Sequence, residues 1–181
     1  MYYRDIWIFM YLSNGMNMDD LVRLRYRNIV DGEIKYIRQK TKRTTNTIQE
    51  ISIAVTAQMQ RIIDTWGNEP FPNNFIFPLI EPTEDAFTHK RRVKNITRCV
   101  NNRLKTIARA ESIERVTTYT ARHSFATVLE RGGASIYYIS ESLGHTSITT
   151  TVNYLSSFKT AERLRHAELL TDFARVSSGT E

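Results

Sequence analysis

The side chains best suited to chemistry lie in two segments of the last third of the chain, TARHSFAT at residues 120–127 and LGHTSITTTVNYL at 143–155. They supply a guanidinium at Arg122, an imidazole at His145 and, nine residues after that histidine, a phenol at Tyr154. A guanidinium can bind two oxygens of one anion, and an imidazole can donate a further hydrogen bond. A phenol is a poor nucleophile unless nearby cations stabilise the charge that its attack creates. The guanidinium and the imidazole would therefore suit the binding of an anion, with the phenol close by in the sequence.

Several other kinds of site have no matching motif. The chain carries no glycine-rich phosphate loop, no His-Glu-x-x-His pair and no nucleophile elbow, which argues against nucleotide, zinc-peptidase and serine-hydrolase sites. Cys99 is the single cysteine, so it forms no internal disulfide or thiolate cluster and agrees with a reducing compartment. No apolar run reaches the length of a membrane span. We therefore expect a cytoplasmic protein with no metal, no other cofactor and no membrane contact.

Each candidate residue also has an ordinary structural interpretation. Tyr154 is one of nine tyrosines, and most tyrosines are packing residues. His145 follows Gly144 and could cap the helix before it, while an isolated arginine such as Arg122 more often forms a surface ion pair. His123, next to Arg122, is better interpreted as structural. Only the joint order and spacing of these residues favours catalysis.

A basic segment adds a second signal. The net charge is +6, and residues 83–110 contain eight Lys or Arg against two acids, so this segment carries the whole excess. On a helix, one stripe would hold Arg91, Lys94, Arg98, Lys105 and Arg109, and the opposite side Val93, Ile96, Val100, Leu104 and Ile107. An ordinary solvated face mixes both charge signs. The scarcity of acids favours contact with a phosphate backbone over a merely solvated surface.

The elements that would position these residues are mostly helical. Apolar spacing predicts helices over residues 2–13, ended by Gly15, and through Leu21 and Leu24, capped by Asp19 or Asp20. A hairpin is predicted with alternating residues from Ile34 to Lys40, a polar turn near 42–45 and a β-branched run over 51–55. Further helices are expected from Thr56 to Gly67, from Thr83 through the basic segment, and over 118–130, 135–143, 147–154 and 160–175.

These elements predict a mixed α+β fold that is mostly α-helical with a small antiparallel β-sheet. Its length fits a single domain over residues 1–181. The four prolines fall between residues 70 and 82 and mark an internal loop.

Arg122, the Leu143-Gly144-His145 turn and Tyr154 resemble, in order and spacing, the catalytic domain of the tyrosine recombinase (phage-type integrase) family. The resemblance implies that Tyr154 attacks a DNA phosphate, releases a 5′-hydroxyl and stays joined to the 3′-phosphate, with Arg122 and His145 stabilising the transition state. Since the phosphoester energy is conserved, no ATP or metal is implied. Lys40, in a Gln-Lys-Thr hairpin like the family's lysine loop, would protonate the leaving 5′-oxygen.

Two positions depart from the family pattern. Asn17 stands where the family has a first catalytic arginine, and Tyr119, three residues before Arg122, stands where His or Lys is usual. A tyrosine still donates a hydrogen bond, whereas an amide brings no charge. Arg38 lies two residues before Lys40, on the same face of a strand, and we hypothesise that it replaces the missing arginine. The alternative is that Arg38 and Lys40 are cations that discourage strand pairing at an exposed edge.

The resemblance also implies partners. Double-stranded DNA is the expected substrate, bound by a homo-oligomer, a tetramer on DNA, while the chain alone could be a monomer. Residues 160–175 are the expected oligomer contact, and family members carry an upstream DNA-binding domain that this chain lacks. The expected function is integration or recombination for a mobile genetic element. Two alternatives stay open: a degenerate, non-catalytic DNA-binding homologue, which Asn17 favours, and a type IB topoisomerase-like enzyme.

Overall fold

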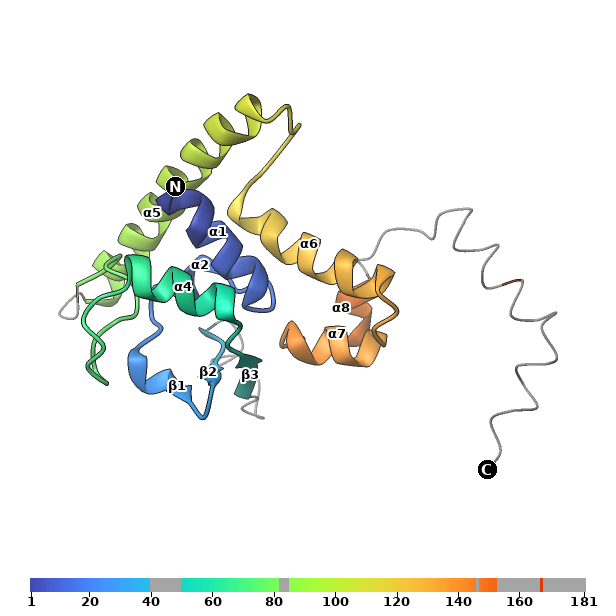
Figure 1. Cartoon of the computed structure of the whole chain (residues 1–181), viewed down its shortest axis with the longest axis horizontal. Helices are drawn as coiled ribbons and strands as arrows, with labels where there is room; N and C mark the ends of the chain where they lie inside the picture. Colours follow the sequence, from blue (N-terminus) through green and yellow to red (C-terminus); the bar gives the residue numbers. More distant parts are fainter. Residues whose placement is uncertain (40–49, 82–84, 146, 153–166, 168–181) are drawn as a thin grey trace.

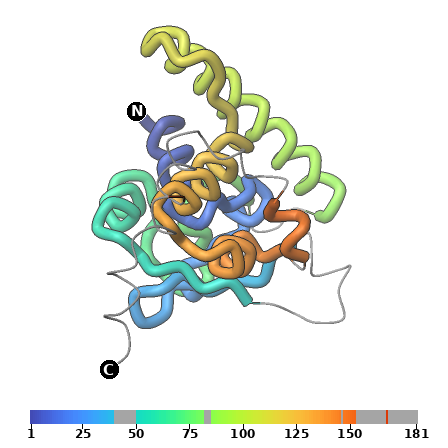
Figure 2. Tube along the Cα trace, turned by 90° about the vertical axis from the view of Figure 1, so that its right-hand side faces the viewer, coloured from blue at the N-terminus to red at the C-terminus, as the bar shows by residue number. Residues whose placement is uncertain are grey.

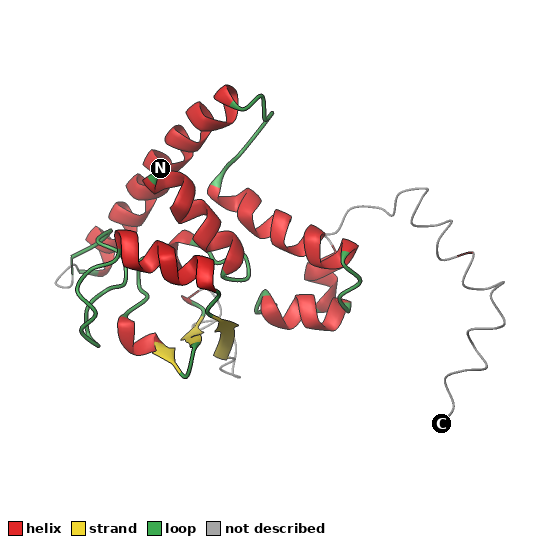
Figure 3. Ribbon diagram, viewed as in Figure 1, coloured by secondary structure: helices red, strands yellow, loops and turns green. Residues whose placement is uncertain are grey.

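The computed structural model describes residues 1–39, 50–81, 85–145, 147–152 and 167 of the chain. In chain order the elements are α1 (Tyr2–Leu12), α2 (Met18–Leu21), η1 (Tyr26–Asn28), β1 (Ile29–Val30), β2 (Glu33–Ile37), β3 (Glu50–Ala54), α4 (Ala57–Trp66), α5 (Ala86–Ala110), α6 (Thr118–Arg131), α7 (Ile136–Ser142) and α8 (Ile148–Val152). Helices predominate, with one small sheet at the lower edge in Figure 3. The mostly helical α+β fold predicted from the sequence is confirmed.

The sheet is antiparallel, with strand order β1-β2-β3. β1 was not predicted from the sequence; it pairs with β2 across a turn in which Asp31 and Gly32 both have positive φ, 52° and 76°. In β2 and β3, buried residues alternate with more exposed ones, and Tyr36 lies opposite Ile51 in the register. One face of the sheet therefore joins the core, below α4 in Figure 1, while α7 lies beside β3 in the turned view of Figure 2.

Buried side chains form two clusters. The larger one, which we call the main core, gathers residues of α1, α2, β2, β3, α4 and α5, together with the segment around Phe77. The smaller one, the distal cluster, consists of Phe125, Ala126, Ile139 and Leu143 from α6 and α7. Tyr11 of α1 packs against both. The Tyr11 side chain therefore links the two clusters at the place where α1 lies against α6 (Figure 1).

Local capping chemistry sets several helix starts. Thr56 caps α4 by accepting a hydrogen bond from the Met59 amide, as predicted. The predicted start of the basic helix at Thr83 is wrong, because Asp85 caps α5 and accepts from the amides of Phe87 and Thr88. A carboxylate there also complements the positive end of the helix dipole.

The cap and the end of the second predicted helix differ in the structure. Asp19 and Asp20 do not cap α2; Asn17 occupies the cap position, and the helix ends at Leu21, before Leu24. Asp19 and Asp20 lie instead in the first turn, where acidic side chains interact favourably with the positive end of the helix dipole. The helix predicted over residues 160–175 lies outside the described residues, apart from residue 167.

The two faces of α5 match the sequence prediction. Val100 and Leu104 are buried in the main core, Val93 and Ile96 pack against it, and Ile107 is half-buried. The opposite stripe is exposed at every predicted cation: Arg91, Lys94, Arg98, Lys105 and Arg109. Within the described segments, no helix combines the length and the apolar composition needed to cross a bilayer.

Candidate active site

Arg122 is a buried arginine on α6. Thr117 starts this helix by accepting a hydrogen bond from the Thr120 amide, and Arg122 lies on its inner side with a relative exposure of 3%. Its Nη1 donates to the Gly15 carbonyl oxygen at 3.2 Å, and its Nη2 donates to the Leu143 carbonyl oxygen. The side chain is therefore fixed between the turn after α1 and the end of α7, and is not the surface ion-pair residue of the ordinary interpretation.

Gly15 permits this close approach. Its φ is +62°, in the left-handed region, and a Cβ at this position would lie 2.5 Å from the Arg122 Cα. Any side chain here would therefore both strain the backbone and push α6 away. The sequence predicted Gly15 only as a helix stop.

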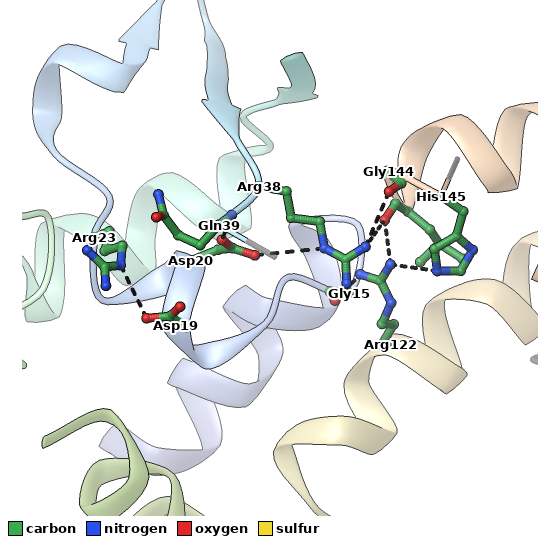
Figure 4. Close-up of polar contacts among 10 residues, drawn as sticks. Gly15, Asp19, Asp20, Arg23, Arg38, Gln39, Arg122, Gly144 and His145 are labelled. Atoms are coloured by element: carbon green, nitrogen blue, oxygen red, sulfur yellow. Dashed lines mark hydrogen bonds and ion pairs between the residues drawn. The ribbon is translucent and has the colours of Figure 1, made fainter. Parts of the chain in front are cut away.

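Arg38 reaches the same place from the other side of the site. β2 ends at Ile37, so Arg38 lies just past the strand and not within it as predicted, and its relative exposure of 7% excludes the exposed-edge interpretation. Its Nη1 donates to the carbonyl oxygens of Leu143 at 3.2 Å and Gly144 at 3.3 Å. The guanidinium groups of Arg38 and Arg122 thus converge on one oxygen, as Figure 4 shows.

His145 completes a cluster of three nitrogen-bearing side chains. It follows the end of α7, where its main-chain amide donates to the Ser140 carbonyl at 3.0 Å. Its ring does not serve as the helix cap considered above, because Nε2 lies 2.9 Å from Arg122 Nη2 (Figure 4). The structure therefore brings together Arg38, Arg122 and His145, which lie as much as 107 residues apart in the sequence.

Asp20 is a buried carboxylate beside these cations that the sequence analysis considered only as a helix cap. One of its oxygens accepts from the Gln39 amide at 2.9 Å, and the other lies 4.0 Å from Arg38 Nε, at the outer limit of an ion pair. Burial raises the pKa of Asp20, and the Gln39 hydrogen bond and the charge of Arg38 only partly oppose that rise. Two guanidinium groups, those of Arg38 and Arg122, lie beside this single carboxylate, so the pocket is electropositive and suits an anion.

The remaining predicted catalytic residues are not part of this described cluster. Tyr154 and Lys40 lie outside the described residues. Tyr119 is on α6 but is 53% exposed, with its ring edge-on to His123 at 4.6 Å between centroids. Asn17, at the position of the family's first arginine, is half-buried and starts α2. Of the predicted catalytic set, the described residues thus unite two arginines and one histidine.

The basic stripe ends beside a cavity. Lys105 and Arg109 of α5 line a hollow of about 470 Å³ together with Arg115, which the sequence analysis did not single out. Asn101 and Thr117 also line it, next to the start of the helix that carries Arg122.

Among the described residues, no group of His, Cys, Asp and Glu side chains could hold a metal ion.

Comparison with characterised proteins agrees with this geometry. Tyrosine recombinase XerD of Corynebacterium glutamicum is 46% identical over 61 residues, which are 34% of this chain and 19% of that protein. Tyrosine recombinase XerD of Chlamydia trachomatis is 26% identical over 148 residues, covering 81% of this chain and 46% of that protein. The chain therefore spans less than half the length of these relatives.

Solved structures show the same fold. XerH site-specific recombinase, bound to palindromic difH substrate in a post-cleavage complex, superposes with a TM-score of 0.63 at 16% sequence identity. The match covers 94% of this chain and 46% of that one.

The family model described as Phage integrase family matches residues 1–161. Together with the convergence of Arg38, Arg122 and His145, this match places the chain in the phage integrase family of tyrosine recombinases.

Proposed function

We propose that this chain is the catalytic domain of a site-specific DNA recombinase or integrase that cuts and rejoins DNA through a 3′-phosphotyrosyl intermediate. The observation that carries the proposal is the convergence of the Arg38 and Arg122 guanidinium groups on the Leu143 carbonyl oxygen, with His145 against Arg122. Hydrogen-bond donors preorganised around one point are what a pentavalent phosphate transition state requires.

The proposed roles follow from donor chemistry. Tyr154 attacks the scissile phosphorus, its phenolic proton passes to solvent water, and a new P–O bond replaces the bond to the 5′-oxygen. A guanidinium carries five N–H donors in a planar fork, so Arg38 and Arg122 can bind non-bridging oxygens from two sides. His145 donates a further hydrogen bond, and Lys40 gives a proton to the leaving 5′-oxygen. The reverse sequence of steps rejoins the strands.

Arg38 is proposed to take the place of the arginine that is missing at Asn17. The proximity of Arg38 to Arg122 supports this role, because both side chains share one acceptor and both are nearly fully buried. The geometry of the Asp20 contact adds to it, since a carboxylate oxygen 4.0 Å from Arg38 Nε leaves Nη1 of Arg38 directed at the shared acceptor. The pocket would then hold two guanidinium groups despite the substitution at position 17.

A nicked suicide substrate tests the enzyme directly. The parent chain should form a protein–DNA complex that survives denaturation, and Tyr154→Phe should form none. Arg38→Ala and Arg122→Ala should each slow covalent capture on the order of 10²-fold or more. Matched controls are Lys35→Ala, in the strand that leads to Arg38, and Arg131→Ala, exposed at the end of α6; both should react at close to the parent rate.

The alternative from a different class is a non-catalytic DNA-binding homologue, which Asn17 favours. It predicts DNA binding with no covalent band from any variant. If Arg38→Ala were as fast as the parent while Tyr154→Phe was inactive, the enzyme assignment would stand and the role of Arg38 would be lost.

DNA binding is proposed to involve the exposed stripe of α5. Cations on one helix face neutralise phosphates and release counterions, so affinity should fall steeply as salt increases. Each of Arg91→Ala, Lys94→Ala, Arg98→Ala, Lys105→Ala and Arg109→Ala should reduce the slope of log affinity against log salt by about one. Arg115→Ala is expected to behave in the same way, because it shares a cavity with Lys105 and Arg109.

The wider setting is proposed from the same family. We expect the chain to act on cytoplasmic DNA as part of a mobile genetic element, with an upstream DNA-binding domain completing the grip on the duplex. A tetramer on DNA, joined through residues 160–175, would contrast with a monomer in the absence of DNA. Light scattering of the chain with and without duplex DNA measures that difference.

A further inference from the structure

Thr151 contacts the His145 ring on the side opposite Arg122. Its Oγ1 lies 2.9 Å from His145 Nδ1, while Nε2 of the same ring lies 2.9 Å from Arg122 Nη2. Thr151 is fully buried, on α8, and precedes Tyr154 by three residues. The imidazole is thus held at both nitrogens, by one side chain of α6 and one of α8.

The chemistry of the two partners fixes the position of the ring hydrogen. A guanidinium has N–H donors and no acceptor, so Nε2 must accept the hydrogen bond from Arg122. In a neutral imidazole one nitrogen accepts and the other carries the hydrogen. The hydrogen therefore lies on Nδ1, which donates to the hydroxyl oxygen of Thr151.

We propose that Thr151 is a positioning residue that holds His145 in the Nδ1–H tautomer, with Nε2 directed into the phosphate pocket. The inference rests on the proposed function, in which His145 assists at the phosphate. The threonine hydroxyl accepts from Nδ1 both in the neutral ring and in an imidazolium. A phosphate oxygen that enters between Nε2 and Arg122 can accept from both, once Nε2 has taken a proton from solvent, while the Thr151 contact persists.

Without the Thr151 hydroxyl, the Nδ1–H group of His145 loses its hydrogen-bond acceptor. A partly buried Nδ1–H that loses its acceptor is unfavourable, so the hydrogen would move to Nε2 or the ring would turn. A hydrogen on Nε2 would face the N–H groups of Arg122, donor against donor. Arg122 therefore selects the Nδ1–H tautomer, and Thr151 supplies the acceptor that this tautomer requires.

Three variants test the proposal. Thr151→Val keeps the shape and removes the acceptor, Thr151→Ser keeps the hydroxyl, and Thr150→Val is a control at an exposed position of the same helix. The first measurement is the ¹⁵N NMR signature of the His145 ring in the protein without DNA. The chain has four histidines, so His145→Gln assigns the signal. The second is single-turnover covalent capture on the nicked substrate, with DNA affinity measured separately.

The parent, Thr151→Ser and Thr150→Val should show the Nδ1–H pattern, and Thr151→Val should lose it. Covalent capture by Thr151→Val should be on the order of 10-fold to 100-fold slower, as when an orienting hydrogen bond to a functional imidazole is removed, with DNA affinity within about twofold of the parent. Thr151→Ser should stay within a few-fold of the parent rate.

An Nδ1–H pattern that survives in Thr151→Val, or a Thr151→Ser variant as slow as Thr151→Val, would overturn the proposal in favour of simple packing. Should Thr151→Val fail to fold, Thr151→Ala read against Thr151→Ser by the same NMR measurement decides the question. The NMR measurement needs neither DNA nor cleavage. A parent that never forms a covalent complex would therefore defeat the proposed function while the tautomer question was still answered.

Discussion

The main core and the distal cluster support the same site with very different amounts of packing. The main core fixes Gly15 and Arg38 through α1, the sheet and α4, with many side chains almost completely removed from solvent. The distal cluster, which holds Leu143 and supports the turn to His145, contains Phe125, Ala126, Ile139 and Leu143 as its buried residues. A region with fewer buried apolar contacts opens at lower free energy. One wall of the site is therefore rigid, and the wall that leads to α8 is more easily moved.

The largest expected contrast comes from removing one phenylalanine in each region. Phe9 is fully buried against Phe77, with centroids 5.0 Å apart, so Phe9→Ala should lower the free energy of unfolding by about 3–5 kcal/mol. Phe125 is 9% exposed in the smaller cluster, and Phe125→Ala should cost less. Urea unfolding followed by circular dichroism measures both.

Exposed Phe71 provides the control for that pair, because Phe71→Ala should change the unfolding free energy by no more than about 0.5 kcal/mol. Equal losses for Phe9→Ala and Phe125→Ala would mean that the two regions are packed alike, and the comparison would fail.

Gly15→Ala acts on the contact between the two regions. The positive φ costs about 1–2 kcal/mol for a residue with a Cβ, and the new atom would also displace α6 at Arg122. A shift of about 1 Å in a catalytic group can cost on the order of 100-fold in rate, so covalent capture should fall by that factor. Gly32→Ala is the matched control: φ is +76°, but nothing lies within 4 Å of its Cβ. Similar rates for the two variants would contradict the close-contact argument.

Removing one helix cap in each region compares the two regions through a smaller loss of stability. Thr56→Ala removes the cap of α4 and Thr117→Ala the cap of α6, each at a cost of about 1 kcal/mol. We expect Thr56→Ala to lower global stability with little effect on covalent capture. Thr117→Ala should also speed amide hydrogen exchange in α6 and slow capture, because α6 carries Arg122. Exchange that rises equally in α4 and α6 for both variants would argue against separate regional stabilities.

The smallest expected effect concerns Asp20. The pKa of Asp20 is raised in the folded chain, mainly by burial. The folded chain therefore binds the Asp20 proton more tightly than the unfolded chain does. The stability associated with the protonated carboxyl is present below the ordinary value of 3.8 and is lost as pH rises through the raised folded value. Asp20→Asn should therefore show a shallower loss of stability than the parent as pH rises from about 3 towards neutrality.

Asp85 gives the opposite sign and serves as the control. Hydrogen bonds from Thr88 and Phe87 lower its pKa, so its contribution is present above the ordinary pKa and is lost as pH falls through the lower folded value. Asp85→Asn should remove part of the stability at neutral pH. Urea midpoints measured across this pH range test both variants, and an unchanged slope in Asp20→Asn would show that the buried carboxyl does not titrate as described.

Local signals in the sequence predicted most of the elements. Thr56 and Ser135 were identified at helix starts because a hydroxyl before an apolar run caps the first turn, and both side chains do so. The apolar and basic faces of α5 followed from helical periodicity. The short strand β1 and the cap of α2 were missed, because two or four residues carry too little periodicity to distinguish them from loop.

The site was predictable only in part. Arg122 and His145 came from a resemblance to the recombinase family in their order and spacing, and Arg38 from its place two residues before Lys40. Their shared acceptor could not be predicted, because a main-chain carbonyl looks the same at every residue. Asp20 and Thr151 were missed as partners for a related reason, since their contacts depend on how distant elements pack and no motif marks them.

That shared acceptor has a consequence for how this protein tolerates change. The Leu143 oxygen belongs to the main chain, so no replacement of the Leu143 side chain removes it. A one-residue insertion or deletion within α7 would instead rotate the end of the helix by about 100° and carry the carbonyl away from both guanidinium groups. The pocket should thus tolerate side-chain substitutions at residue 143. It should not tolerate insertions or deletions between residues 136 and 144.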